Sequence, residues 1–340
     1  MLIRMFIILG LGLYGCASVV QPSSSKATTN QPYISSQPLN EPKLFAEGII
    51  STGDEEFGMT FMPDGLTVYF VKAEAQGRFQ AIVFSHFQDG KWITPEVAAF
   101  SGQWRDIDPF ITPDGKKLFF ASNRPLGGTE PKKDFDIWVV DKTASGWSSP
   151  RNLGAPVNTE GMEINTSVTS NGTLYVAAND RPGSKADKGK RDLYRFKLVN
   201  GAYASAELLD EPINLPQYDD ANHFIAPDES FLMFCSDRPG GTLKFNLYIS
   251  FNENGKWTQP TNLGNNINKE GGGPFTPMLS PDGKYLFFAN RVSFADRPLM
   301  QSLSYQQLVT KIRNPGNGLA DIYQIDFNIA EIKKSVARLD

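Results

Sequence analysis

Short apolar runs recur along the chain at regular intervals, each of them directly after a polar turn. Most of these turns read Pro-Asp-Gly, in which Pro presets φ, Asp bonds its own backbone and Gly adopts positive φ. Such a turn joins a short strand to the apolar strand behind it, so the pattern predicts a β-hairpin. The turns begin at Met62, Thr112, Thr169, Ala226 and Ser280, and the apolar runs are 68–70, 118–120, 174–176, 231–234 and 285–288.

Two further strand patterns follow most of the hairpins. The third strands are 81–84, 136–140, 192–196, 246–249 and 321–325, and the fourth strands are 95–100, 150–153, 206–209 and 260–263. Successive turns begin 50 to 57 residues apart. Four antiparallel strands in a unit of about 50 residues are typical of a propeller blade. The sequence therefore predicts an all-β fold, a β-propeller with four-stranded blades.

A strand pattern near the N-terminus can supply the strand that the last unit lacks. The last unit has no clear fourth strand after 321–325, whereas 41–45 resembles such a strand and has no unit in front of it. We predict five blades, with this N-terminal strand closing the ring on the last blade; six blades are the less favoured count. Closure removes the open sheet edges on which other chains could pair.

The phrases Ser-Pro-Asp-Gly-Lys-Tyr-Leu-Phe-Phe-Ala-Asn-Arg (280–291) and Ser-Asp-Arg-Pro-Gly-Gly (236–241) resemble the repeat of the TolB-like β-propeller family. The resemblance covers roughly 41–328. The chain departs from the family repeat in two turns, at Ser170-Asn171 and at Glu229. Its first unit also lacks the Asn/Asp-Arg-Pro phrase. The resemblance implies a propeller fold and, for function, a periplasmic or surface protein, possible roles including a structural scaffold of envelope complexes.

The start of the chain is typical of exported bacterial proteins. Arg4 precedes an apolar run, 5–13, which is too short to span a bilayer and is typical of a signal peptide. Small residues before Cys16 resemble a bacterial lipobox, although Tyr14 is bulkier than usual there. We expect residues 1–15 to be removed and Cys16 to be lipidated; an ordinary signal peptide with an incidental Cys is the alternative. Ala17 follows the cysteine at a position where an aspartate would suggest retention in the inner membrane. By resemblance to bacterial lipoproteins, this residue favours the outer membrane, with the domain facing the periplasm or the cell surface.

Composition limits the remaining possibilities. Residues 16–40 are rich in Ser, Thr, Gln and Pro and predict a polar tether, while 329–340 form a C-terminal tail. Cys235 lies in an apolar strand, so no internal disulfide is expected once Cys16 carries lipid. The net charge is −4, and aspartates interrupt the basic loops, which gives no indication of nucleic-acid binding. A monomer is expected.

Carboxylates recur at one position of the first strand in each unit. Seven residues before the Pro of the turn (Ser170 in the third unit) stand Glu56, Asp106, Glu163, Asp220 and Pro274, and five residues before it stand Gly58, Asp108, Asn165, Asn222 and Thr276. Because strand side chains alternate, both positions lie on one face. The innermost strands thus predict a ring of acids at one mouth of the channel.

Basic residues come to the same mouth after the second strands. They are Lys72, Arg124, Arg181, Arg238 and Arg291. Acid–Arg pairs between blades would hold the ring in register, because the guanidinium fork binds a carboxylate with two hydrogen bonds. Residues that break the repeat are better candidates for ligand binding. The predicted ligand-binding residues are Trp104, Asp108, Asn165, Tyr218, Asp219, Asn222 and His223, of which His223 has a purely structural role as its alternative.

Three functions are compatible with this mouth. We favour a lipid-anchored binding module for a glycan or a protein partner. A glycoside-active enzyme is the second, with Glu163 as acid, Asp106 as base and Asp220 tuning them. An envelope scaffold is the third. No cofactor is expected, apart from weak Ca²⁺ candidates at Glu56, Asp106, Glu163 and Asp220.

The last unit contains a long insertion, 292–320. Within it 304–313 predicts a short helix, with Ser304 as its N-cap and Asn314-Pro315-Gly316 as its end. Loop geometry predicts that the helix lies over the acid-bearing mouth, either as a lid or as a plug.

Overall fold

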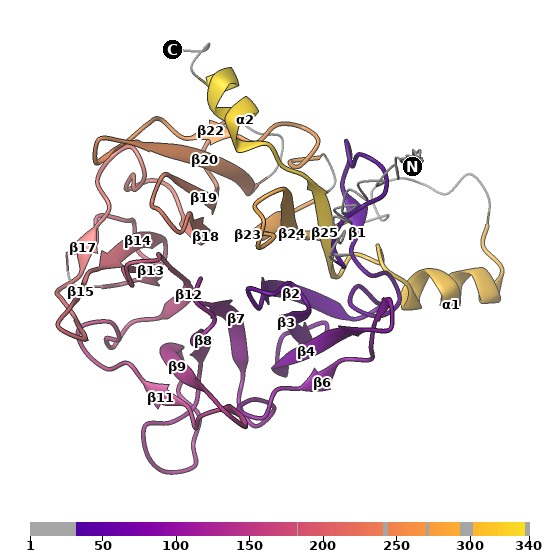
Figure 1. Cartoon of the computed structure of the whole chain (residues 1–340), viewed down its shortest axis with the longest axis horizontal. Coiled ribbons are helices and arrows are strands. Elements are labelled where there is room, and N and C mark those ends of the chain that lie inside the picture. Colours follow the sequence, from indigo (N-terminus) through magenta and orange to yellow (C-terminus); the bar gives the residue numbers. More distant parts are fainter. Residues whose placement is uncertain (1–31, 182, 241–243, 270–271, 293–301, 337–340) are drawn as a thin grey trace, which may run out of the picture. The chain divides into compact units, whose positions relative to one another are not determined.

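The computed structural model describes residues 32–181, 183–240, 244–269, 272–292 and 302–336. The chain divides into two compact units, residues 1–30 and 31–340, and only the second contains described residues. The predicted signal peptide and Cys16 lie outside them. In the second unit, five small antiparallel sheets surround a common axis (Figure 1). The unit is a five-bladed β-propeller, which confirms the predicted fold class.

The blades follow one another along the chain, and each runs from its innermost strand outward. Blade 1 consists of β2 (Glu55–Phe61), β3 (Thr67–Ala73), β4 (Gln80–Gln88), β5 (Lys91–Trp92) and β6 (Glu96–Val97). Blade 2 consists of β7 (Asp106–Ile111), β8 (Lys117–Ser122), β9 (Asp136–Thr143), β10 (Gly146–Trp147) and β11 (Arg151–Asn152).

The other three blades repeat this order with local changes. Blade 3 consists of β12 (Glu163–Val168), β13 (Leu174–Asn179), β14 (Arg191–Phe196), β17 (Glu207–Leu208) and a separate hairpin of β15 (Leu198–Val199) and β16 (Ala202–Tyr203). Blade 4 consists of β18 (Asp220–Ile225), β19 (Phe231–Ser236), β20 (Asn246–Glu253), β21 (Lys256–Trp257) and β22 (Thr261–Asn262). Blade 5 consists of β23 (Pro274–Leu279), β24 (Tyr285–Arg291), β25 (Ala320–Asp326) and β1 (Lys43–Leu44).

The N-terminal strand closes the ring, as predicted. Lys43 pairs with Gln324 and Leu44 with Tyr323, and the N–H of Phe45 donates to the carbonyl of Ile322 at 2.9 Å. The blades pack face to face around the axis, so both faces of the inner strands are covered. All seven residues of β2 are buried for this reason. The aromatic-rich runs after the turns supply most of the shared core.

Residues 33–39, which we call the strap, lie against the junction of blades 5 and 1. Tyr33 and Leu39 are buried in the main core, and the N–H of Leu39 donates to Asp326 Oδ2 at 2.9 Å. The predicted tether, 16–40, therefore ends too late. Its described part packs on the propeller, because two widely spaced apolar side chains are enough to anchor an otherwise polar segment.

The helix predicted within the insertion is α1 (Tyr305–Arg313), capped by Ser304 as expected. Its position differs from the prediction. Figure 1 shows α1 beside the ring rather than above its centre, and none of its residues is buried. The helix is tied back to blade 1 through Asn317, whose Nδ2 donates to the carbonyl of Gly53 at 2.9 Å. The described part of the insertion is therefore neither a lid nor a plug of the channel; residues 293–301 lie outside the described ranges.

The C-terminal segment ends in α2 (Ile329–Val336), where we expected only a tail. Ile329, Ile332 and Val336 pack against the main core. No helix among the described residues is long and apolar enough to cross a membrane.

Candidate functional site

The acids predicted at the mouth are buried and bound to basic side chains. Arg238 Nη2 lies 2.9 Å from Asp220 Oδ1, and Arg124 Nη2 lies 2.7 Å from Asp106 Oδ1. In the other two blades with an acid at this position, Arg181 Nη1 lies 3.2 Å from Glu163 Oε1, and Lys72 Nζ lies 2.7 Å from Glu56 Oε1. The four carboxylate side chains are fully buried.

These pairs lie within a blade, whereas we predicted pairs between blades. The acid is on the innermost strand and its base follows the second strand of the same sheet. The arginines reach the preceding blade through carbonyl groups instead. Arg238 donates to the carbonyl oxygens of Pro212 and Ile213 at 3.2 and 2.6 Å, and both of these residues lie in the link from blade 3. Of the five predicted bases, Arg291 is the one whose described acid partner, Glu55, belongs to a different blade.

A complete set of partners makes each arginine a structural clamp. Arg124 lies over the rings of Phe120 and Trp138, at 4.9 and 5.2 Å from their centroids. Such stacking, together with charge-assisted hydrogen bonds, fixes the side chain. Burial raises the pKa of Asp220 to about 6 and also raises the pKa of Glu163. As the carboxylates face their clamps, they offer no open acid–base pair to a substrate.

The same burial bears on metal binding. No group of three or more His, Cys, Asp or Glu side chains within the described ranges is arranged to hold a metal ion. Glu56, Asp106, Glu163 and Asp220, the weak Ca²⁺ candidates, thus do not form a site together.

The second predicted position forms a ring around the axis. Each innermost strand has a register shift there, and each ring residue adopts positive φ: Gly58, Asp108, Asn165, Asn222 and Thr276. Such bulges turn side chains inward. Asn165 Nδ2 donates to Asp108 Oδ2 at 2.5 Å and to Asn222 Oδ1 at 3.1 Å. The cavity left at this level is about 30 Å³, which leaves room for little more than water.

Asp108 and His223 are the titratable groups next to this cavity. Burial raises the pKa of Asp108 to about 7 and lowers the pKa of His223 to about 4. Neither ring nitrogen of His223 has a hydrogen-bond partner in the described part of the chain. The structure therefore brings Asp108, Asn165, Asn222 and His223 together around one small cavity.

The other three predicted ligand-binding residues lie apart from this ring. Asp219 forms an ion pair with Arg191 at 2.7 Å, and Tyr218 lies under the guanidinium of Arg238. Trp104 is half-buried in the link before β7. The structure does not bring Trp104 and Tyr218 together as a stacking platform.

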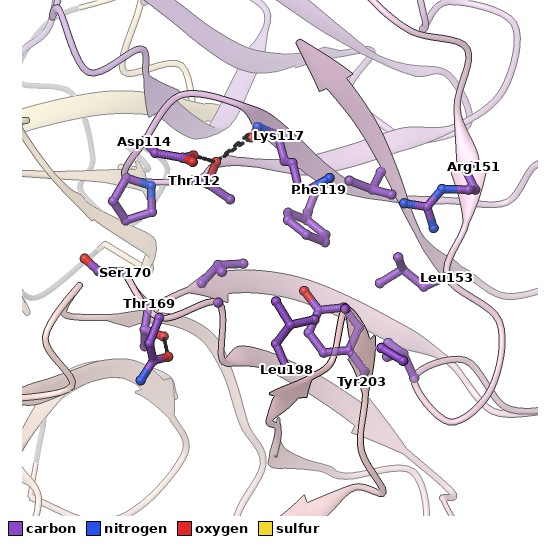
Figure 2. Close-up of a pocket in the computed structure, with 18 of the residues that line it drawn as sticks. Thr112, Asp114, Lys117, Phe119, Arg151, Leu153, Thr169, Ser170, Leu198 and Tyr203 are labelled. Atoms are coloured by element: carbon purple, nitrogen blue, oxygen red, sulfur yellow. Dashed lines mark hydrogen bonds between the residues drawn. The ribbon is translucent and has the colours of Figure 1, made fainter.

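An open groove of about 860 Å³ lies at the opposite end of the ring, between blades 2 and 3. We call this end, which carries the Pro-Asp-Gly turns, the turn end. Figure 2 shows the side chains of both blades facing each other across the groove. Its walls are apolar, and its rim is polar. The walls include Phe119, Val139, Leu153, Val168, Leu198 and Tyr203, and the rim includes Thr112, Asp114, Lys117, Arg151, Ser170 and Asn171.

Blade 3 differs from its neighbours beside the groove. Its third strand is interrupted at Lys197, and the continuation, β15, pairs with β16 as the third strands of the other blades pair with β5, β10 and β21. Tyr203 stands where the other hairpins carry Trp92, Trp147 and Trp257. Leu198 remains 43% exposed at the edge of the groove. In the sequence, Gly201-Ala202-Tyr203 matches the turn and aromatic of the other units, and the tyrosine in place of a tryptophan is the signal that marks this blade.

Three charged side chains line the groove: Arg151, Lys117 and Asp114. Arg151 is exposed and opposes the effect of burial on Tyr203, which raises the pKa of that phenol to about 12. Lys117 pairs with Asp141 at the end of the groove. Because Arg151 forms no ion pair with a described carboxylate, it is available to a negatively charged group.

Comparison with known proteins identifies no family for this chain. No protein-family model matches the chain, and no curated protein sequence matches it. Among solved structures, a putative TolB from Agrobacterium tumefaciens is 14% identical over 81% of this chain and 91% of that one, with a TM-score of 0.45. An α-L-arabinofuranosidase from Podospora anserina is 12% identical over 86% and 95%, with a TM-score of 0.44. The propeller itself is the part of the TolB-like resemblance that the structure bears out.

Proposed function

We propose that this protein is a binding module without catalytic activity, which takes its partner in the groove between blades 2 and 3. One contrast supports the proposal. The candidate catalytic carboxylates are fully buried and paired, whereas the groove is open and has apolar walls and a polar rim. Binding sites commonly have this composition and a volume of roughly 300–1,000 Å³. The proposal keeps the expected role and moves the site from the channel mouth to the turn end.

Binding of anilinonaphthalene sulfonate, an apolar anion, tests the groove. We expect its fluorescence to rise on addition of the purified full chain, and Leu198→Trp to reduce this rise by filling the groove. Leu66→Trp is the matched control, because Leu66 is also 43% exposed and does not line the groove. Equal fluorescence of wild type and both variants would overturn the assignment of the site.

A glycoside-active enzyme is the second candidate, supported by the raised pKa of Asp220. Assays of the wild type against a panel of polysaccharides address it. We expect no turnover. Turnover that disappears in Glu163→Gln and Asp106→Asn would replace the binding proposal by the enzyme.

We further propose that the module is held at the bacterial cell envelope through lipid on Cys16, with the outer membrane as its place. Several acyl chains on one residue give stable anchoring, since each buried methylene contributes about 0.8 kcal/mol. Metabolic labelling with an alkyne fatty acid should modify the wild type and not Cys16→Ser. Equal labelling of both would contradict the anchor.

A further inference from the structure

The pseudo-symmetry of the ring shows what an occupied groove looks like. The junction of blades 5 and 1 corresponds to the junction of blades 2 and 3. Phe287 pairs with Gln324, which pairs with Lys43, just as Phe119 pairs with Val139, which pairs with Arg151. In the first junction the strap fills the groove. Tyr33 contacts the rings of Phe61 and Tyr285, with centroids 5.4 and 6.1 Å apart.

The other junctions are closed by groups of their own blades. Between blades 1 and 2, Trp147 Nε1 donates to the hydroxyl of Tyr69 at 2.9 Å. Between blades 3 and 4, the hydroxyl of Tyr175 donates to Glu229 Oε1 at 2.8 Å. Between blades 4 and 5, Phe327, just before α2, packs on Phe231 with ring centroids 6.4 Å apart. The junction of blades 2 and 3 has no such closing group among the described residues.

The position that Tyr33 fills at one end of the strap is empty in the open groove. The position equivalent to Leu39, at the other end of the strap, is taken by another group. Tyr33 lies close to Asp282, which corresponds to Asp114 on the rim of the open groove. At the other end, the carbonyl of Leu39 accepts the N–H of Asp326. In blade 2 the corresponding N–H, that of Asp141, donates to Ser148 Oγ at 3.0 Å. The open groove therefore has room for an aromatic side chain and a short piece of backbone.

The position of Arg151 is basic in both grooves, where Lys43 is its counterpart, and the open groove carries a second cation, Lys117. Lys117 and Arg151 stand where the filled groove has Tyr285 and Lys43. Lys117 is paired with Asp141, and Arg151 is exposed. A carboxylate beside the aromatic side chain of a ligand would meet Arg151 and gain a charge-assisted hydrogen bond.

We propose that the open groove binds a peptide segment of a partner protein, which inserts a tyrosine or tryptophan where Tyr33 lies in the filled groove and places a carboxylate beside Arg151. The proposal rests on the proposed function and specifies its ligand. A peptide is favoured over a glycan because the occupant of the equivalent groove is itself a peptide segment. Its backbone contributes there, as the N–H of Ser35 donates to the hydroxyl of Tyr285 at 3.3 Å.

A fluorescently labelled peptide with the sequence of residues 32–40 is the probe, titrated with the purified full chain by polarisation. We expect saturable binding, weakened at least tenfold by Tyr33→Ala in the peptide and at least tenfold by Leu198→Trp in the protein. Leu66→Trp should bind like the wild type. The peptide variant Ile34→Asp should bind severalfold more tightly, and Arg151→Glu should abolish that gain. Binding that is insensitive to Leu198→Trp or to the tyrosine would overturn the proposal.

The remaining outcomes separate this proposal from the proposed function. Dye binding that responds to Leu198→Trp, without any peptide binding, would overturn the peptide ligand and leave the groove as a binding site. If the protein is retained on a polysaccharide column and Leu198→Trp weakens this retention, the peptide ligand is overturned and the ligand of the groove is a glycan. Concentration-dependent dimers that Leu198→Trp abolishes would assign a second copy of the chain instead. If neither dye nor peptide responds to the variant, both proposals fail.

Discussion

The two ends of the propeller use the same repeat in opposite ways. At the mouth, one clamp of acid and arginine recurs in three successive blades with nearly the same partners. At the turn end, each junction is closed by a different group, and the junction of blades 2 and 3 is left open. Repeated residues thus hold the ring together. The residues that differ from blade to blade lie at the turn end, and we propose that the binding site is there.

The largest effect should follow from breaking a clamp. Arg238→Ala leaves Asp220 buried without its cation and two linker carbonyls without their donor. Loss of one partner of a buried pair costs about 3–5 kcal/mol. We expect the free energy of unfolding, measured by guanidinium denaturation, to fall by that amount.

Arg291→Ala is the matched control at the same mouth. The side chain of Arg291 is 48% exposed, so its pair with Glu55 should contribute about 1 kcal/mol or less. If both variants lose the same free energy of unfolding, burial does not make the Arg238 clamp stronger than the exposed pair of Arg291. The structural role given to the clamps at the mouth would then be contradicted.

The filled and open grooves should differ in their tolerance to truncation. Tyr33 is 2% exposed and packs on two rings, so Tyr33→Ala should cost about 3 kcal/mol. Tyr203 borders the open groove and is only half-buried, so Tyr203→Ala should cost about 1 kcal/mol. Denaturation of both variants measures the difference. A reversed order would show that the strap is not an integral part of the propeller.

Asp108 on the axis should give a smaller effect that depends on pH. Its pKa is raised from 3.8 to about 7 by burial, so the folded state binds more protons than the unfolded state between about pH 4 and 7. Stability from this group is therefore present at low pH and lost as the pH rises through about 7. Asp108→Asn, which copies Asn165 and Asn222, should be more stable than the wild type by on the order of 2 kcal/mol at pH 8.

The comparison of wild type and Asp108→Asn across pH 5 to 8 isolates this group, because the opposing titration of His223 is common to both proteins. The difference in free energy of unfolding should grow with pH. A constant difference would show that Asp108 is already ionised in the folded protein.

The fold could be predicted from the sequence because its signals lie close together along the chain. Each Pro-Asp-Gly turn and the apolar run behind it lie within about ten residues, and their period predicts the ring. The unpaired pattern at 41–45 even predicted how β1 closes the ring on β25. The same spacing placed Asp106 and Glu163 at one height, but their partners depend on how the loops after β8 and β13 fold back.

The groove could not be predicted, because it depends on what is missing. At the junction of blades 2 and 3 no described residue takes the place of Tyr33, which lies 252 residues before its neighbour Tyr285. The strap itself escaped prediction for the same reason: Tyr33 and Leu39 are isolated in a polar segment, and only the completed ring gives them a surface to pack on.

The pairing of β1 with β25 also sets an order of events during folding. Blades 1 to 4 are built from neighbouring hairpins, so each can form from a continuous stretch of chain. Lys43 and Leu44, near the start of the propeller, pair with Tyr323 and Gln324, near its end. Until these segments meet, blade 5 lacks its outermost strand, so nearly the whole propeller sequence must be present before the circle can be completed.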